Sequence, residues 1–238
     1  MSIGGYRHPY LYDVINYPNK EMEEMEKEEL VDELTNIARD AFGIDITKED
    51  VKSHILPVST MTLALDEEEI IGFSTSNYYN IRDYDIIYLV GTCVLRKYQG
   101  NGIFSNLLDI TLKEETFKHN GTEIFITRTQ NPVLYSGVIK FLDEIYPSGY
   151  ECKYCKSPNN TSNKKEYLQL GKIFAKEILN GELSDNFVMR KAYGVCMYDA
   201  IPRSKDQHVN SLFDKLLNYE KGDAVLIVGK LTYPFYEG

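Results

Sequence analysis

The sequence predicts an α/β protein (in the broader sense, α+β), with a mixed β-sheet flanked by helices and a C-terminal extension. Two observations carry this prediction. The first is a pattern of three successive strands in the middle of the chain. The second is a strand–turn–helix–strand unit over residues 85–127, which begins with the third of these strands. Strands joined through a helix form a right-handed crossover, so we expect two parallel neighbours. We expect the sheet to splay between them, near a glycine turn, and a cleft at such a point is a usual ligand position.

Charge and hydropathy limit the partners that we expect. The formal net charge is −10, and no long Lys/Arg run is present, which argues against nucleic acid. An acidic surface is compatible with a cationic substrate such as an amine, but solubility is its more common explanation. The first nine residues lack the apolar core of a signal peptide, and no stretch approaches the ~18 apolar residues of a membrane span. We therefore expect a cytoplasmic protein without a membrane partner.

Two helices are predicted before the first strand. Apolar residues recur at helical spacing over residues 19–42, and Gly43 follows as a C-terminal cap. A second helix is expected over residues 47–56, because Thr47 can cap its start and Pro57 ends it.

Three strands follow, at residues 60–65, 70–79 and 85–95. The third strand ends in a turn that contains Gly100 and Gly102, and a helix is expected directly after it, over residues 101–119. Residues 123–127 form a short apolar strand of the kind that is buried on both faces. A helix is then expected over residues 132–145, with Pro132 in its first turn.

The C-terminal extension, residues 156–238, is predicted to hold a polar loop, two helices and a strand. In chain order they lie at residues 157–165, 166–179, 209–217 and 223–231. An apolar strand needs a sheet in which to lie, so we expect the last strand to return to the main sheet. At 238 residues the chain can bury one substantial core, and we predict a single domain with its core at residues 19–155.

Cysteine spacing suggests a metal or redox site at only one place, Cys152-x-x-Cys155. A structural zinc ion needs four ligands, and neither a second such pair nor a histidine pair accompanies it. Turn residues flank the pair, whereas redox chemistry needs a helix start. We interpret these cysteines as ordinary thiols and predict no metal.

The segment from Thr92 to Phe104 is the most informative part of the chain. An apolar strand runs into a turn with two glycines, and a helix begins at once. This arrangement aims several backbone N–H groups at one point in front of a helix N-terminus, which suits the phosphates of a nucleotide-like ligand. A Cβ atom at Gly100 or Gly102 would keep a phosphate away from the backbone.

Two familiar phosphate loops are excluded. A P-loop needs a Lys followed by Ser or Thr at the helix start, and this turn has neither. A dinucleotide loop needs a third glycine on the first βα unit, and Phe104 and Ser105 follow Gly102 instead.

What remains is Gln99-Gly100-Asn101-Gly102-Ile103-Phe104, which resembles the acyl-CoA loop of the GNAT N-acyltransferase superfamily, Gln/Arg-x-x-Gly-x-Gly/Ala. Gln99 and Gly102 match the motif, and Phe104 departs from it at the last position. The order of helices and strands over residues 19–150 also resembles that family. The resemblance implies an N-acetyltransferase that moves an acetyl (acyl) group from acetyl-CoA to a primary amine by direct attack.

The resemblance also implies a set of cofactor-binding residues. They are Cys93, Val94, Leu95, Gln99, Gly100, Asn101, Gly102, Ile103, Phe104, Ser105 and Asn131. The turn amides would bind the CoA pyrophosphate, and residues 93–95 would run beside the pantetheine arm. The Val94 N–H would polarise the thioester carbonyl. Asn131 resembles a loop asparagine of the family. Arg96 and Lys97 leave two alternatives open: charge for the phosphates, or solvated loop cations.

For catalysis, the resemblance implies a tyrosine that protonates the departing thiolate, and Tyr135 lies in the expected helix. A packed core tyrosine is the alternative. The general base stays unassigned, because Asp85 lies at the far end of its strand and Glu123 is at a strand start. Cys93 is not expected to carry an acyl group, because the family transfers directly.

A second function stays open, a catalytically silent acyl-CoA-binding sensor or assembly module, which the missing carboxylate favours. The acceptor could be a small amine, a peptide N-terminus or a lysine. Two roles are open for the extension, a lid or the contact of a homodimer.

Overall fold

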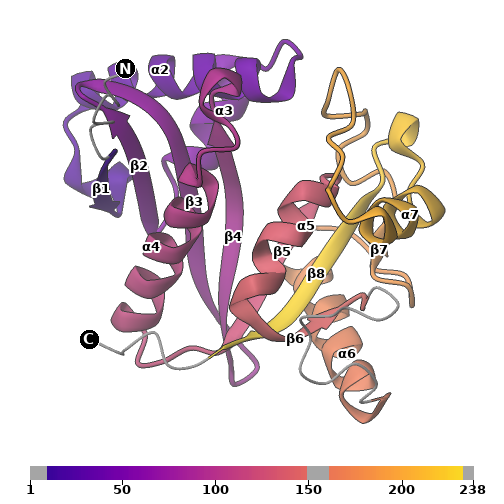
Figure 1. The fold of residues 1–238 in the computed structure, drawn as a ribbon. Helices are drawn as coiled ribbons and strands as arrows, with labels where there is room; N and C mark the ends of the chain where they lie inside the picture. The colour runs from indigo at the N-terminus through magenta and orange to yellow at the C-terminus, as the bar shows by residue number, and fades with distance from the viewer. Residues whose placement is uncertain (1–9, 149–160, 233–238) are drawn as a thin grey trace, which may run out of the picture.

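The computed structural model describes residues 10–148 and 161–232, and within these an eight-stranded mixed sheet forms the centre of the fold (Figure 1). The strands are β1 (Leu11–Asn16), β2 (Thr60–Asp66), β3 (Glu69–Ile81), β4 (Tyr84–Val94), β5 (Ile124–Thr129), β6 (Leu142–Tyr146), β7 (Val188–Met189) and β8 (Ala224–Leu231). Their order is β1-β2-β3-β4-β5-β8-β6, and β7 pairs with β8 off this path. The predicted fold class, a mixed and open sheet flanked by helices, is confirmed.

The sheet splays between β4 and β5, as predicted. These two strands are parallel and pair only from Ile86–Ile124 to Leu89–Thr127. Beyond that point β4 continues to Val94 beside β3 only, while β5 stays paired with β8 up to Thr129. Figure 1 shows the two strands diverging toward the end at which α4 and α5 begin.

Helices cover both faces of the sheet. They are α1 (Pro18–Glu21), α2 (Glu24–Phe42), α3 (Lys48–Ile55), α4 (Ile103–Lys118), α5 (Pro132–Val138), α6 (Thr161–Glu177) and α7 (Gln207–Leu216), with 3-10 turns η1 (Arg96–Tyr98), η2 (Ile139–Phe141) and η3 (Tyr219–Lys221). Neighbouring residues of β4 point to opposite faces: Ile87 packs in the core under α4, α5 and α7, and Ile86 packs in the core under α6. This double coverage explains why β4 and β5 are apolar throughout.

The N-terminal helical region differs from the prediction in one respect. The expected single helix over residues 19–42 is two helices, because the chain is extended at Met22 and Glu23. Glu23 and Glu26 form a capping box that starts α2. The cap predicted for the next helix is confirmed, since the Thr47 hydroxyl accepts a hydrogen bond of 3.1 Å from the Asp50 N–H.

The helix predicted over residues 132–145 was wrong in its second half. Helix α5 ends at Val138, and after η2 the chain forms strand β6, which pairs with β8 from Leu142 to Tyr146. The apolar residues at helical spacing include Leu142 and Ile145, which are buried as strand residues instead. Pairing with the free edge of β8 decides the outcome, because an unpaired buried edge would leave backbone groups without partners.

The extension contributes β7, β8, α6 and α7 to the same sheet and cores. Strand β8 lies between β5 and β6, inside the sheet.

The loop predicted over residues 157–165 was wrong at its end, because α6 begins at Thr161. The Cys152–Cys155 pair lies outside the described residues. Strands β1 and β7 were not predicted. Strand β1 is largely exposed, and β7 has only two residues, so neither has a periodic pattern.

A buried carboxylate holds the C-terminal end of α4 against the sheet. Glu115 is fully buried, and its Oε1 accepts hydrogen bonds from the hydroxyls of Ser59 and Ser76. Its Oε2 lies 3.3 Å from Nε2 of His119, and the ammonium of Lys118 is 3.6 Å from Oε1. Burying a charge is tolerated only with such partners. The contacts fix α4 relative to β2 and β3.

We predict that Phe213→Ala destabilises the whole described fold. Phe213 is fully buried and packs edge to face on Tyr135 at 5.7 Å between ring centroids. The cavity should lower the free energy of unfolding by about 3–5 kcal/mol. Urea unfolding followed by far-UV circular dichroism should show one cooperative transition with a lower midpoint. Two transitions, with only one of them shifted, would contradict the single-domain prediction.

Candidate functional site

A cleft of about 700 Å³ lies where β4 and β5 diverge. Its walls come from the end of α2, the end of β4, the glycine turn, α5 and the tail segment 198–209. All of the predicted cofactor-binding residues line it except Leu95 and Asn101. Leu95 packs among apolar residues instead, and the Asn101 amide donates a hydrogen bond to the Tyr98 carbonyl at 3.0 Å.

The backbone of the glycine turn is left-handed at both of its glycines. Gly100 and Gly102 both have φ of +83°, and a Cβ at either would meet no atom within 4 Å. The backbone conformation therefore requires glycine, and the space in front of the turn is open. The side chain of Gln99 positions the turn, because its amide donates to the Val94 carbonyl at 3.0 Å.

The N-terminus of α4 is open to this space. Gly102 is its N-cap, and no side chain of the described residues caps it. The first hydrogen bond of the helix runs from the Asn106 N–H to the Gly102 carbonyl. The N–H groups of residues 103–105 therefore have no acceptor within the helix, and they can receive an anion.

The Val94 N–H faces the splayed side of β4. Val94 lies opposite Gly72 of β3, while the next residue, Leu95, donates its N–H to Ile71 at 2.9 Å. Successive N–H groups of a strand point in opposite directions, so the Val94 N–H points away from β3. It faces the side on which pairing with β5 has already ended at Leu89.

Cys93 lines the cleft as a protonated thiol. Its side chain is only 6% exposed, and burial raises its pKa to about 12. The thiolate, which is the nucleophilic form, is therefore scarce at neutral pH.

Tyr135 is placed as a core residue. It is 1% exposed, its ring packs on Phe213, and its hydroxyl donates a hydrogen bond of 2.7 Å to the Pro147 carbonyl. This geometry favours the packed tyrosine over the proton donor, because the proton is directed at a backbone acceptor.

Tyr198, which sequence reasoning missed, lies in the cleft beside Cys93. Its ring packs on Phe42 at 5.0 Å between ring centroids, and its hydroxyl lies near the Asn131 side chain. Burial raises the pKa of Tyr198, so its hydroxyl keeps its proton at neutral pH. Neither motif nor spacing marks this residue, because the tail reaches the cleft only through tertiary contacts.

Several contacts hold the tail segment around Tyr198 across the cleft. The Met197 N–H donates to the Gln130 side chain at 2.9 Å, and the Asp199 N–H donates to the Phe42 carbonyl at 3.1 Å. Asp199 also pairs with Arg96 at 2.8 Å. This segment therefore bridges α2 and the end of β5.

The two loop cations are both paired with carboxylates. Arg96 contacts Asp199, and Lys97 contacts Glu69 at 2.9 Å. The pKa of Asp199 is lowered mainly by its hydrogen bond with Arg96. These pairs favour the interpretation of Arg96 and Lys97 as exposed loop cations.

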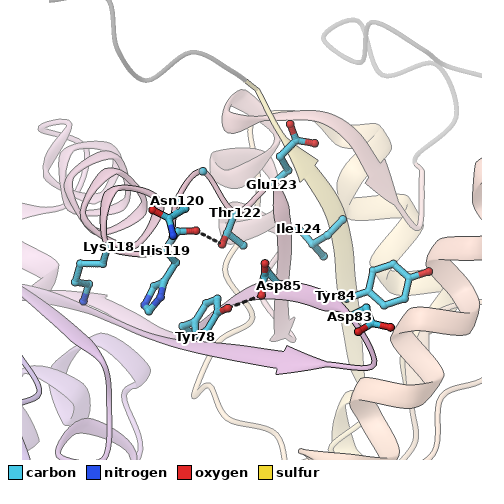
Figure 2. A pocket seen from close by; sticks show the side chains of 11 residues that line it. Tyr78, Asp83, Tyr84, Asp85, Lys118, His119, Asn120, Thr122, Glu123 and Ile124 are labelled. Atoms are coloured by element: carbon cyan, nitrogen blue, oxygen red, sulfur yellow. Dashed lines mark hydrogen bonds between the residues drawn. The ribbon is translucent and has the colours of Figure 1, made fainter.

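The carboxylates considered as general bases lie at the other end of the sheet. Asp85 and Glu123 line a second cavity of about 370 Å³ (Figure 2). Asp85 accepts a hydrogen bond from Tyr78, which lowers its pKa, and Glu123 pairs with Lys230 at 2.8 Å. Val94 lies nine positions after Asp85 along β4, about 30 Å at strand rise. Neither carboxylate can reach a thioester beside Val94.

The described residues contain no group of three or more His, Cys, Asp or Glu side chains that could hold a metal ion. Across residues 10–148 and 161–232, no helix combines the length and apolar character that crossing a bilayer requires.

Comparisons with known proteins find a family match. The model of the acetyltransferase (GNAT) family matches residues 13–135, and no curated protein matches the chain. One similar structure is the ribosomal-protein-S18-alanine N-acetyltransferase from Escherichia coli, with 10% identity, a TM-score of 0.45 and coverage of 96% of this chain and 99% of that one.

Two further structures are similar over about half of the chain. YhbS from Escherichia coli, a GNAT family N-acetyltransferase in complex with CoA, has 19% identity and a TM-score of 0.40, over 57% of this chain and 69% of that one. The glucosamine N-acetyltransferase region of a fungal multi-domain GH3 β-N-acetylglucosaminidase has 22% identity and a TM-score of 0.41 over 50% of this chain. The match spans 14% of that fungal protein's length.

We predict that Cys93 resists alkylation in the folded protein. With a pKa of about 12, its thiolate fraction at pH 8 is about one in 10⁴. Iodoacetamide should therefore modify Cys93 at least ~10²-fold more slowly than the half-buried Cys196. Peptide mass spectrometry measures both rates, and in urea they should converge. Equal rates in the native protein would contradict the protonated thiol.

Proposed function

The chain belongs to the acetyltransferase (GNAT) family, and from this premise we propose that it transfers an acetyl group from acetyl-CoA to a primary amine by direct attack. One observation carries the proposal: the uncapped N-terminus of α4 opens into the cleft at which β4 and β5 diverge. A helix N-terminus that can receive an anion and an exposed strand end thus share one cavity.

The turn and the start of α4 would bind the CoA pyrophosphate. Gly100 and Gly102 allow the backbone to approach the ligand, and the N–H groups of residues 103–105 have no helical acceptor. The helix dipole adds about 0.3–1 kcal/mol at an exposed site. Asn101 and Leu95 are left out of the proposed contacts, because they do not line the cleft.

The end of β4 would hold the thioester. When bound, acetyl-CoA supplies an activated acyl group and a thiolate leaving group. The Val94 N–H, which faces the splayed side of the sheet, would donate to the thioester oxygen as charge develops there. Cys93 would contact the pantetheine arm as a neutral, small side chain. Its high pKa supports direct attack by the amine over an acyl-cysteine.

Tyr198 is our candidate for the group that donates a proton to the departing sulfur. It lines the cleft beside Cys93, whereas the Tyr135 hydroxyl is directed at Pro147. The raised pKa of Tyr198 keeps a proton on its oxygen. A donor of this kind typically contributes 10²–10⁴-fold to a rate.

One observation favours the second candidate, an acyl-CoA-binding module without catalysis. Among the described residues that line the cleft, Asp206 is the one carboxylate, and it caps α7. Of the described residues, no carboxylate other than Asp206 therefore lines the cleft to take a proton from the amine, which at its usual pKa of about 10.4 is protonated at neutral pH. Turnover distinguishes the two functions.

We predict that the protein binds CoA and releases thiol from acetyl-CoA when a suitable primary amine is present. Gly102→Val should weaken CoA binding at least about tenfold, because a side chain at φ of +83° is strained and projects into the phosphate path. Calorimetry measures the affinity, and thiol release across small amines, N-terminal peptides and lysine peptides measures turnover.

Gly194→Val is the matched control. Gly194 also has positive φ, +73°, with open space at its Cβ position, and it does not line the cleft. This variant should keep the wild-type CoA affinity. Undetectable CoA binding by the wild-type protein would overturn the proposal, and binding without thiol release from any amine would favour the silent module.

We predict that Tyr198→Phe lowers kcat about 10²-fold and leaves the KM for acetyl-CoA nearly unchanged, because the lost proton matters only at the departing sulfur. Tyr135→Phe should keep kcat within about threefold and lower stability by about 1 kcal/mol through its lost buried hydrogen bond. Steady-state kinetics and urea unfolding provide these values. The reverse pattern would assign the proton to Tyr135.

A further inference from the structure

The cleft continues beyond the glycine turn along α5. Asn131 caps the start of α5, where its side chain meets Tyr198. Ser136 and Lys140 also line the cleft, further along α5 and η2. Lys140 lies nine positions after Asn131, a rise of about 13 Å in a helix. The cleft therefore has two ends, one at Cys93 and Tyr198 and the other at Lys140.

The tail forms the second wall at the Lys140 end. The hydroxyls of Ser136 and Ser204 lie 2.6 Å apart, which joins α5 to the tail. Lys140 follows Ser136 by one helical turn, and Lys205 follows Ser204 directly, so both lysine stems begin near this hydroxyl pair. Both lysines line the cleft and are exposed.

These two lysines form a local excess of positive charge in an acidic protein. Neither has a salt bridge with any described residue, whereas Arg203 on the same wall is bound by both oxygens of Asp214, at 2.7 and 2.8 Å. One carboxylate, Asp206, lines this end, and it accepts a hydrogen bond from the His208 N–H at 2.9 Å. Two free ammonium groups above a cleft suit a doubly charged anion, because lysine binds phosphate as a point charge.

The proposed position of CoA decides which anion reaches this end. Coenzyme A carries its pantetheine arm on one side of the pyrophosphate and a 3′-phosphorylated adenosine on the other. With the pyrophosphate at the start of α4 and the thiol end beside Cys93, the adenosine must lie on the remaining side of the turn. On that side, the cleft extends along α5.

Phe104, the residue that departs from the loop motif, closes the space between α4 and α5. A Cβ at Gly137 would come within 2.2 Å of the Phe104 ring, so the ring lies directly on the α5 backbone. A ligand that leaves the turn in this direction must pass over the ring, along the wall that carries Ser136 and Lys140.

We propose that Lys140 and Lys205 bind the 3′-phosphate of coenzyme A, so that the C-terminal extension selects the 3′-phosphorylated cofactor. This inference rests on the proposed function. It assigns a binding role to the extension, which supplies Lys205 and the Ser204 contact.

Calorimetry with CoA and with 3′-dephospho-CoA tests the proposal. The wild-type protein should bind CoA about tenfold more tightly at low salt, since two partly exposed lysine contacts contribute a factor of this order. The difference should shrink as ionic strength rises. The double variant Lys140→Gln/Lys205→Gln should bind CoA as weakly as dephospho-CoA and keep the wild-type affinity for dephospho-CoA.

The matched control is Lys176→Gln/Lys221→Gln. It removes the same two charges from exposed lysines that do not line the cleft, and it should keep the preference for CoA. Equal binding of CoA and dephospho-CoA by the wild-type protein would overturn the inference and leave the proposed function intact. So would equal loss of both ligands in the Lys140/Lys205 variant, or loss of the preference in the control. Binding of neither ligand by the wild-type protein would instead overturn the proposed function.

Discussion

The divergence of β4 and β5 is the constraint on which the rest of the structure depends. Their pairing ends at Leu89 and Thr127, and beyond these residues β4 lies beside β3 only and β5 beside β8 only. The end of β4 is then left with a backbone edge that faces a cavity, and the helices that follow β4 and β5 both begin at its rim. In this geometry a strand N–H and an uncapped helix N-terminus can act on the same ligand.

Helix α4 can serve such a site only if its axis is fixed, and it is held at both ends. Ile103 and Leu107 pack in the core on one face of the sheet, and Glu115 is hydrogen-bonded by Ser59 and Ser76 at the other end. A buried carboxylate is costly unless it has partners, so this network also disfavours other positions of α4. The same region holds the polar cavity of Figure 2, which is distant from the cleft.

The extension contributes both to the sheet and to the walls of the cleft. It supplies β8, which pairs with β5 on the side opposite β4. It also supplies a wall of the cleft, with Tyr198 at the thiol end and Lys205 at the other in the proposed orientation of CoA. The site is therefore assembled from segments about 100 residues apart in sequence, such as Arg96 and Asp199, which pair across it.

The sequence by itself determined what depends on local conformation. Backbone sterics account for the positive φ at Gly100 and Gly102, and side-chain capping accounts for Thr47 at the start of α3. Hydrophobic periodicity accounts for the apolar strands of the splayed sheet. All three effects act within a few residues of the chain. Only the tertiary structure decided the secondary structure of residues 142–146 and the position of Tyr198. The apolar spacing of residues 142–146 fits either a helix or a strand, and pairing with β8 selects the strand. Tyr198 reaches the cleft through its ring contact with Phe42 and through its neighbours, since Met197 binds Gln130 and Asp199 pairs with Arg96. No local pattern records such distant partners.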